Sequence, residues 1–263
     1  MGEPVAAAST PLSGVKVQRV ERWFYATVAV MMILFNAVAF APPFLDPSLR
    51  RVPLPLTPIV AAHATVSVAW LFLFLVQAGL VATRRIHLHR RLGVLGAALA
   101  VAFVVLGSLA TIEEARRGHD LAGNVARVPP PPGSVDSRAA QLSVLLLFFL
   151  FAVLVGAALW YRKRPAIHRR LMSIALLGAL TQTPVAHLIG SWIGPQEWTG
   201  LLFPISGALF LSLILLHDYM TEGRVHPLSL WVSVLVLGST VLFDSWIVGT
   251  GGWLRFSDWL LAR

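Results

Sequence analysis

The side chains with the most chemical potential in this sequence are its eight histidines. His63 and His187 lie at similar depth in two different apolar segments, each about one turn from a segment end. Two neutral imidazoles that face each other across a helix bundle can hold haem iron, and imidazole with a carboxylate can hold zinc, copper or non-haem iron. The first hypothesis is therefore haem b or a transition metal at His63 and His187, with Asp244 as a further metal ligand.

A second group of histidines lies in two related basic blocks. The tetrapeptide His-Arg-Arg-Leu begins at His89 and again at His168, each time between two apolar segments. A histidine in the first turn of a helix lies at the positive end of the helix dipole, which favours the neutral, ligating form. Neighbouring guanidinium groups and free helix N–H groups can bind phosphate or carboxylate. The candidates at this end are His89, His168 and His217 for a cofactor, and Arg90, Arg91, Arg169 and Arg170 for an anion.

Each pattern also has a structural explanation. A histidine inside a membrane can hydrogen-bond to Ser, Thr or Gln of a neighbouring helix, which contributes about 0.6–2 kcal/mol. Basic residues at span ends are expected from the positive-inside rule. Intramembrane histidines also serve proton transfer. A redox or metal-binding protein, a transporter and an anionic-lipid-binding protein all stay open.

Composition determines which elements must position these residues. The chain is 57% hydrophobic and 13% charged, whereas soluble proteins are about 25% charged. Segments of about 20 apolar residues can cross a bilayer, and they must be helical because lipid cannot satisfy backbone polar groups. We therefore predict an all-α integral membrane bundle of seven transmembrane helices. The expected spans are Trp23–Phe44, Pro55–Thr83, Leu92–Ile112, Ala139–Tyr161, Leu171–Trp192, Trp198–Leu216 and Pro227–Gly249.

The distribution of charge predicts the orientation of this bundle. Most of the 21 Lys and Arg residues precede the first span or lie at 84–91, 162–170 and 217–226. The positive-inside rule then places the N-terminus in the cytoplasm and the C-terminus outside. Residues 1–22 are expected to be a mobile cytoplasmic segment, 23–249 the membrane domain, and 250–263 an amphipathic tail in the outer interface. The basic residues sit at span ends and no nucleic-acid motif is present, so membrane lipids rather than nucleic acid are the expected partners.

Several local features refine this prediction. In the second span, His63, Trp70 and Gln77 share one helical face, which must point into the bundle. The first span is expected to end at Pro42-Pro43, and Pro184 is expected to kink the fifth span near His187. Aligning the two His-Arg-Arg-Leu blocks also predicts a tandem repeat, in which helices 2–3 and helices 4–5 form equivalent hairpins. The polyproline loop at 129–133 is expected to form a partial lid outside.

The basic blocks also carry a resemblance to known proteins. The stretches His89–Gly93, His168–Met172 and Gly223–Pro227 resemble loop signatures of a family of bacterial polytopic membrane proteins of uncharacterised function. The junction His-Arg-Arg-Leu-Met is also similar to one in a small family linked with cytochrome oxidase assembly. The resemblance implies a bacterial plasma (inner) membrane location, and it favours redox work or assistance in respiratory oxidase assembly, with other membrane redox proteins as partners.

Overall fold

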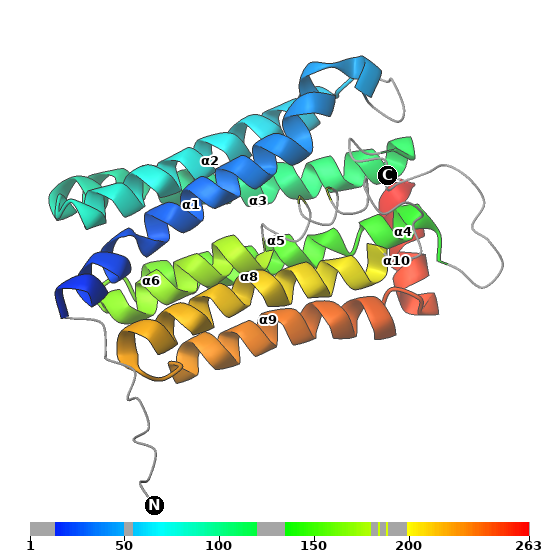
Figure 1. Cartoon of the computed structure of the whole chain (residues 1–263). Coiled ribbons are helices and arrows are strands. Elements are labelled where there is room, and N and C mark those ends of the chain that lie inside the picture. The colour runs from blue at the N-terminus through cyan, green and yellow to red at the C-terminus, as the bar shows by residue number, and fades with distance from the viewer. Residues whose placement is uncertain are drawn as a thin grey trace, which may run out of the picture.

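The computed structural model describes residues 14–49, 55–119, 135–179 and 199–262 and, between the last two ranges, Pro184 and Leu188. Every described element is helical, and the long helices run alongside one another in a bundle (Figure 1). The elements are α1 (Gly14–Leu45), η1 (Pro47–Leu49), α2 (Pro58–Ala82), α3 (Ile86–Arg117), α4 (Ser137–Gln141), α5 (Val144–Trp160), α6 (Pro165–Ile174), the π-helix η2 (Ala175–Ala179), α8 (Thr199–Glu222), α9 (Pro227–Trp246) and α10 (Gly251–Leu261).

The described helices confirm an all-α integral membrane protein. Six of them are long and apolar enough to cross a bilayer: Trp23–Leu45, Pro58–Ala82, Ile86–Arg117, Ser137–Trp160, Pro204–Glu222 and Pro227–Trp246. Large apolar side chains such as Phe72, Phe149 and Leu235 are exposed on the bundle surface, as contact with lipid requires.

The fifth expected span, Leu171–Trp192, is described from its start to Ala179 and at Pro184 and Leu188. Its remaining residues, His187 among them, lie outside the described part of the chain, as do residues 1–13 and the polyproline loop. The count of seven spans, the Pro184 kink and the external lid therefore stay predictions.

The helices differ from the expected spans chiefly at their ends. The expectation that the first span ends at Pro42-Pro43 was wrong, because α1 continues to Leu45. Both prolines lie in its last turn, where each removes one i→i−4 hydrogen bond without ending the helix, and the Asp46 N–H donates to the Pro42 carbonyl at 2.9 Å. At the other end, α1 begins at Gly14, so part of the expected 1–22 segment is helical.

At the basic blocks the helices begin earlier than the expected spans, which started at Leu92 and Leu171. α3 begins at Ile86, which places His89 in its first turn, and α6 begins at Pro165. α8 continues past Leu216 to Glu222. Proline at the first position suits a helix start because its missing N–H would have no intrahelical partner. Charged residues outside the expected spans therefore extend the helices, and Arg170 among them faces α8.

Three helix pairs turn at the end of the bundle where α1 begins (Figure 1). The turns are Thr83–Arg85 between α2 and α3, Tyr161–Arg164 between α5 and α6, and Gly223–His226 between α8 and α9. We call this the basic end, comprising residues 83–91, 161–170 and 217–226. The hairpins α2–α3 and α5–α6 share this turning end, as a tandem repeat requires, although the repeat itself stays a prediction.

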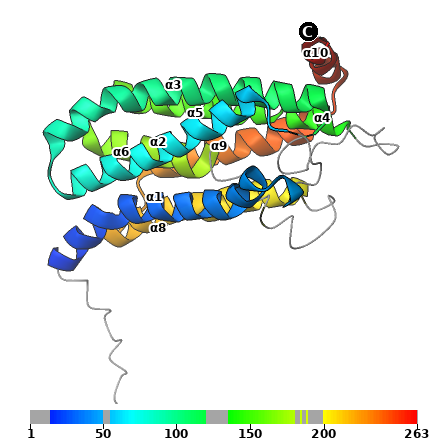
Figure 2. The same cartoon turned by 90° about the horizontal axis from the view of Figure 1, so that it is seen from above.

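The opposite end, called the far end, carries α4 and α10. The expected amphipathic tail is the helix α10, whose N-cap Thr250 accepts a hydrogen bond from the Trp253 N–H. The Trp253 indole donates to the Ala139 carbonyl at 3.0 Å, and Arg116 donates to the Leu260 carbonyl at 2.8 Å. These bonds hold α10 against α3 and α4, across the end of the bundle (Figure 2).

An aromatic cluster forms the middle of the bundle. Trp70 of α2 and Phe103 of α3 both contact Phe151 of α5, with ring centroids 5.1 and 4.9 Å apart. Trp70 and Phe151 are buried, so the polar face of α2 points inward as predicted. These interlocked rings fix the spacing of α2, α3 and α5, the helices that lead to the basic end.

Gly107 on α3 lies within this tightly packed region and supplies a test of it. A Cβ there would lie 2.2 Å from the Phe148 ring and 2.8 Å from the His63 ring. We expect Gly107→Ala to destabilise the bundle by about 1–3 kcal/mol through overpacking. The measurement is thermal unfolding in detergent, followed by circular dichroism. Gly156→Ala is the matched control, because no atom lies within 4 Å of its added Cβ, and equal stability of the two variants would contradict this packing.

Candidate functional site at the basic end

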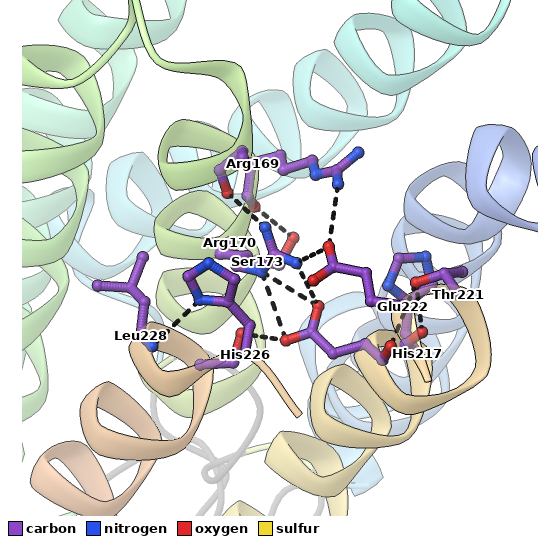
Figure 3. A network of polar contacts seen from close by, with 11 residues as sticks. Arg169, Arg170, Ser173, His217, Thr221, Glu222, His226 and Leu228 are labelled. Atoms are coloured by element: carbon purple, nitrogen blue, oxygen red, sulfur yellow. Dashed lines mark hydrogen bonds and ion pairs between the residues drawn. The ribbon is translucent and has the colours of Figure 1, made fainter. Parts of the chain in front are cut away.

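A buried arginine organises the basic end. The side chains of Arg170 on α6 and Asp218 on α8 are each 1% exposed. Arg170 donates from its Nη2 to Asp218 Oδ1 at 2.8 Å and from its Nε to the same oxygen at 3.1 Å (Figure 3). It also donates to the Glu222 carboxylate and, from its Nη1, to the Ala166 carbonyl at 3.1 Å. All three nitrogens of this guanidinium therefore have protein acceptors.

Two further contacts extend this ion pair into a network. The Ser229 hydroxyl of α9 donates to Asp218, and Arg169 lies 3.8 Å from the Glu222 carboxylate. Two arginines thus face two carboxylates, so the group is neutral overall. Burial would lower the pKa of Arg170, but its hydrogen bonds to Asp218 and Glu222 raise that pKa above its ordinary value. The network, comprising Arg169, Arg170, Asp218, Glu222 and Ser229, joins α6, α8 and α9.

The four predicted anion-binding arginines have different surroundings. Arg170 is bonded internally, while Arg169 is only partly exposed and ion-paired. Arg90 and Arg91 are exposed on α3. The predicted contact with an external anion therefore rests on Arg90 and Arg91.

Asp218, Glu222 and Ser229 were not among the predicted site residues. Glu222 carried a signal, because it lies four residues after Asp218 on one helical face. Its contribution was missed since α8 was expected to end at Leu216. Ser229 had no such signal, because a serine just after the proline at a helix start reads as an ordinary first-turn residue.

The two block histidines lie next to each other. The rings of His89 and His168 have centroids 6.3 Å apart and planes inclined by 80°. His168 Nδ1 lies 2.8 Å from the Ala158 carbonyl oxygen. Nδ1 must carry the proton to donate to that carbonyl, which leaves Nε2 of the neutral ring as a free acceptor or ligand. The sequence prediction that these histidines share one end of the bundle agrees with this arrangement.

Polar atoms beside His89 have unused bonding capacity. Gln77 of α2 lies beside the His89 ring. Among the described residues, neither His89 Nδ1 nor Gln77 Oε1 has a hydrogen-bond partner, and both atoms are buried. Buried polar atoms without partners are costly in a folded protein and call for an explanation, of which a bound ligand is one.

The remaining histidines of this end have separate environments. His217, a predicted cofactor ligand, is 3% exposed and stacks on Phe24 of α1, with ring centroids 4.0 Å apart and planes at 27°. His226 caps α9 by accepting a hydrogen bond from the Leu228 N–H at 3.2 Å. His87 is exposed. These contacts give His217 and His226 roles in packing and capping.

The predicted site nearer the far end is only partly described. His63 packs against Phe103 and Phe148, with ring centroids at 5.2 and 5.7 Å, and no described residue hydrogen-bonds to its buried Nδ1. Asp244 is exposed near the end of α9, and His187 lies outside the described residues. No group of three His, Asp or Glu side chains suited to a metal occurs within the ranges that the structure covers. The set His63, His187 and Asp244 stays a prediction.

Comparisons with family models, with curated proteins and with solved structures found no match to this chain. The geometry of the basic end is therefore the basis for a functional proposal. Two features stand out there: a charge network that satisfies itself, and a histidine pair that retains free ligand positions.

The charge network predicts a large and unequal response to two conservative substitutions. Asp218→Asn leaves Arg170 buried without its main counter-charge, so we expect a loss of about 3–5 kcal/mol in the free energy of unfolding. Glu222→Gln should cost less, because the Glu222 side chain is 32% exposed and water can compensate. Chemical unfolding in a constant detergent compares the two. Equal effects would show that Asp218 is not the principal partner of Arg170.

Proposed function

We propose that this protein is an integral membrane redox protein that binds haem b through His89 and His168. The observation that carries the proposal is the pair itself, two imidazoles from two different helix starts at a centroid separation of 6.3 Å. Haem iron takes its axial ligands from the protein, and histidine is a common one. A bound haem would supply one-electron transfer.

The rings lie close enough together that His89 and His168 would be the residues to hold one bound haem. The hydrogen bond from His168 Nδ1 to the Ala158 carbonyl matches the support that ligating histidines usually have, because it fixes the tautomer and the ring orientation. His89 Nδ1, which has no hydrogen-bond partner within the part of the chain that the structure describes, adds a second available nitrogen.

The positions of the pair in the helices support the same proposal. His89 and His168 lie in the first turns of α3 and α6, where the helix dipole favours the neutral, ligating form of imidazole. The positive-inside rule assigns the basic end to the cytoplasmic face of a bacterial plasma membrane. A redox centre there would exchange electrons with other membrane redox proteins near that face, including a respiratory oxidase under assembly.

His63 supports a second site of the same kind. Its buried Nδ1 is without a hydrogen-bond partner among the described residues, and its predicted counterpart is His187. A metal at this position, with Asp244 as a further ligand, is the alternative occupant. The two sites would lie toward opposite ends of the bundle, with at most one haem near each membrane face.

The haem proposal predicts a visible spectrum that depends on particular histidines. Protein purified from its native membrane should show a Soret band that shifts on reduction, and elemental analysis should find iron in proportion to protein. His89→Ala and His168→Ala should each lose the bis-histidine spectrum, because one axial ligand is removed. His87→Ala is the control, since His87 is exposed and belongs to no ring contact described above.

The same measurement distinguishes the alternatives. A spectrum that loses part of its intensity in His63→Ala would identify a second haem, whereas bound metal without a Soret band would indicate a metal site. Protein with neither haem nor metal would refute the redox proposal. In that case a transporter in which these histidines move protons or solute takes its place.

A second candidate function, binding of anionic lipid, is favoured by the exposure of Arg90 and Arg91 at the basic end. Arginine at the membrane surface attracts anionic headgroups, and its planar fork binds phosphate through two hydrogen bonds, which lysine cannot reproduce. This candidate is compatible with the haem proposal because it uses different side chains.

Lipid binding predicts a difference between arginine and lysine at these positions. Changing Arg90 and Arg91 together to Lys preserves charge but removes bidentate contacts, so less anionic lipid should remain bound after purification. Native mass spectrometry with a vesicle-derived mixture of anionic and zwitterionic lipid provides the measurement. Arg84→Lys with Arg85→Lys is the matched control in the adjoining turn. Unchanged lipid retention in the Arg90 and Arg91 variant would rule out a specific headgroup site.

A further inference from the structure

The short helix α6 presents two functionally different side chains on opposite sides. His168 and Arg170 are two residues apart on α6 (Pro165–Ile174), so they are rotated by about 200° around the helix axis. His168 points toward His89 and the Ala158 carbonyl at the end of α5. Arg170 points toward Asp218 and Glu222 of α8. A rotation of α6 would therefore displace both contacts at once.

Two kinds of contact fix the orientation of this helix. Leu171 and Ile174 of α6 are buried in the apolar core, and α6 passes directly into the π-helix Ala175–Ala179. Apolar packing is non-directional, whereas the hydrogen bonds of Arg170 to Asp218 and Glu222 are directional and join α6 to α8 (Figure 3). The contacts of Arg170 therefore define most closely which way α6 faces.

We propose that Arg170, held by Asp218, is the positioning residue that keeps His168 directed at His89. The part of this inference that concerns a cofactor rests on the proposed haem site, whereas the juxtaposition of the two histidines does not. Arg170 touches neither ring. It acts by fixing the rotation and depth of α6 against α8 and α9.

The chemistry of the pair favours a positioning role over a contribution to stability alone. Replacing a buried ion pair by well-packed apolar side chains is often neutral or stabilising, so burial of Arg170 and Asp218 is weak evidence for a stabilising role. The distinctive property of the Arg170–Asp218 pair is the fixed direction of its hydrogen bonds. Two guanidinium nitrogens donate to one carboxylate oxygen, at 2.8 and 3.1 Å, and Ser229 fixes the carboxylate from α9. Lysine preserves the charge but loses this two-point geometry.

The absence of cysteine from the chain allows a direct test that needs no cofactor. Cysteines introduced by His89→Cys and His168→Cys would be joined by a short bifunctional thiol reagent in membranes. The double-cysteine protein should crosslink efficiently, and adding Arg170→Lys should lower the crosslinked fraction several-fold. Arg162→Lys is the matched control, because it makes the same change at an exposed position of the same hairpin and should leave crosslinking unchanged.

A second measurement links the geometry to the proposed haem. In protein that retains both histidines, Arg170→Lys should increase the fraction of reduced haem that binds carbon monoxide, because a displaced His168 opens an axial position. Lower stability alone would not change this fraction in folded, monodisperse protein. If Arg170→Lys does not fold, Ser229→Ala is used for both measurements, since it retains the ion pair and removes only one of its supports.

The outcomes separate the two proposals. Crosslinking that is equal in the Arg170→Lys and Arg162→Lys backgrounds would overturn the positioning role, whatever the cofactor content. Poor crosslinking of the double-cysteine protein itself would also overturn it, because the two positions would not then be adjacent. Arg170-dependent crosslinking, combined with the absence of haem from protein that retains both histidines, would support the positioning role and refute the haem proposal.

Discussion

The constraint on which the basic end depends is the electrostatic cost of a guanidinium buried inside a membrane bundle. A buried cation without partners would be strongly disfavoured. For Arg170 this desolvation cost is offset by hydrogen bonds to Asp218, Glu222 and the Ala166 carbonyl. Because each acceptor must lie in a fixed direction, the helices that carry them have little freedom. The relative placement of α6, α8 and α9 follows from satisfying one side chain.

The histidine pair depends on this arrangement from one side and on the aromatic cluster from the other. The interlocked rings of Trp70, Phe103 and Phe151 set the distances among α2, α3 and α5, and α3 carries His89. The Arg170 network orients α6, which carries His168. Apolar packing thus positions the helix that carries His89, and ionic contacts position the helix that carries His168.

The sequence predicted the features that depend on residue type and periodicity. Span length and apolar content identified the membrane helices, and the spacing of His63, Trp70 and Gln77 identified the inward face of α2. It could not assign Arg170 to an internal partner, because a positive-inside signal, a lipid contact and a buried ion pair all use the same basic residues at a span end. The ends of α3 and α8 were misjudged for a related reason. Charged segments at a membrane surface resemble loops unless the opposite charge that faces them is known, and Glu222 lies far from Arg170 in sequence.

The charge network and the histidine pair at the basic end differ in how many of their polar atoms have hydrogen-bond partners. This difference suggests a structural role for the network and a binding role for the pair. In the charge network, all three guanidinium nitrogens of Arg170 donate to protein acceptors, so this buried side chain has little remaining capacity to bind anything else. Beside it, His89 Nδ1 and Gln77 Oε1 are buried without hydrogen-bond partners among the described residues, and the bond of His168 to Ala158 leaves Nε2 free. Buried polar atoms without partners carry a desolvation cost, so the contrast between the bonded ion pair and the neighbouring imidazoles is the physical basis for proposing a ligand at the imidazoles rather than at the charges.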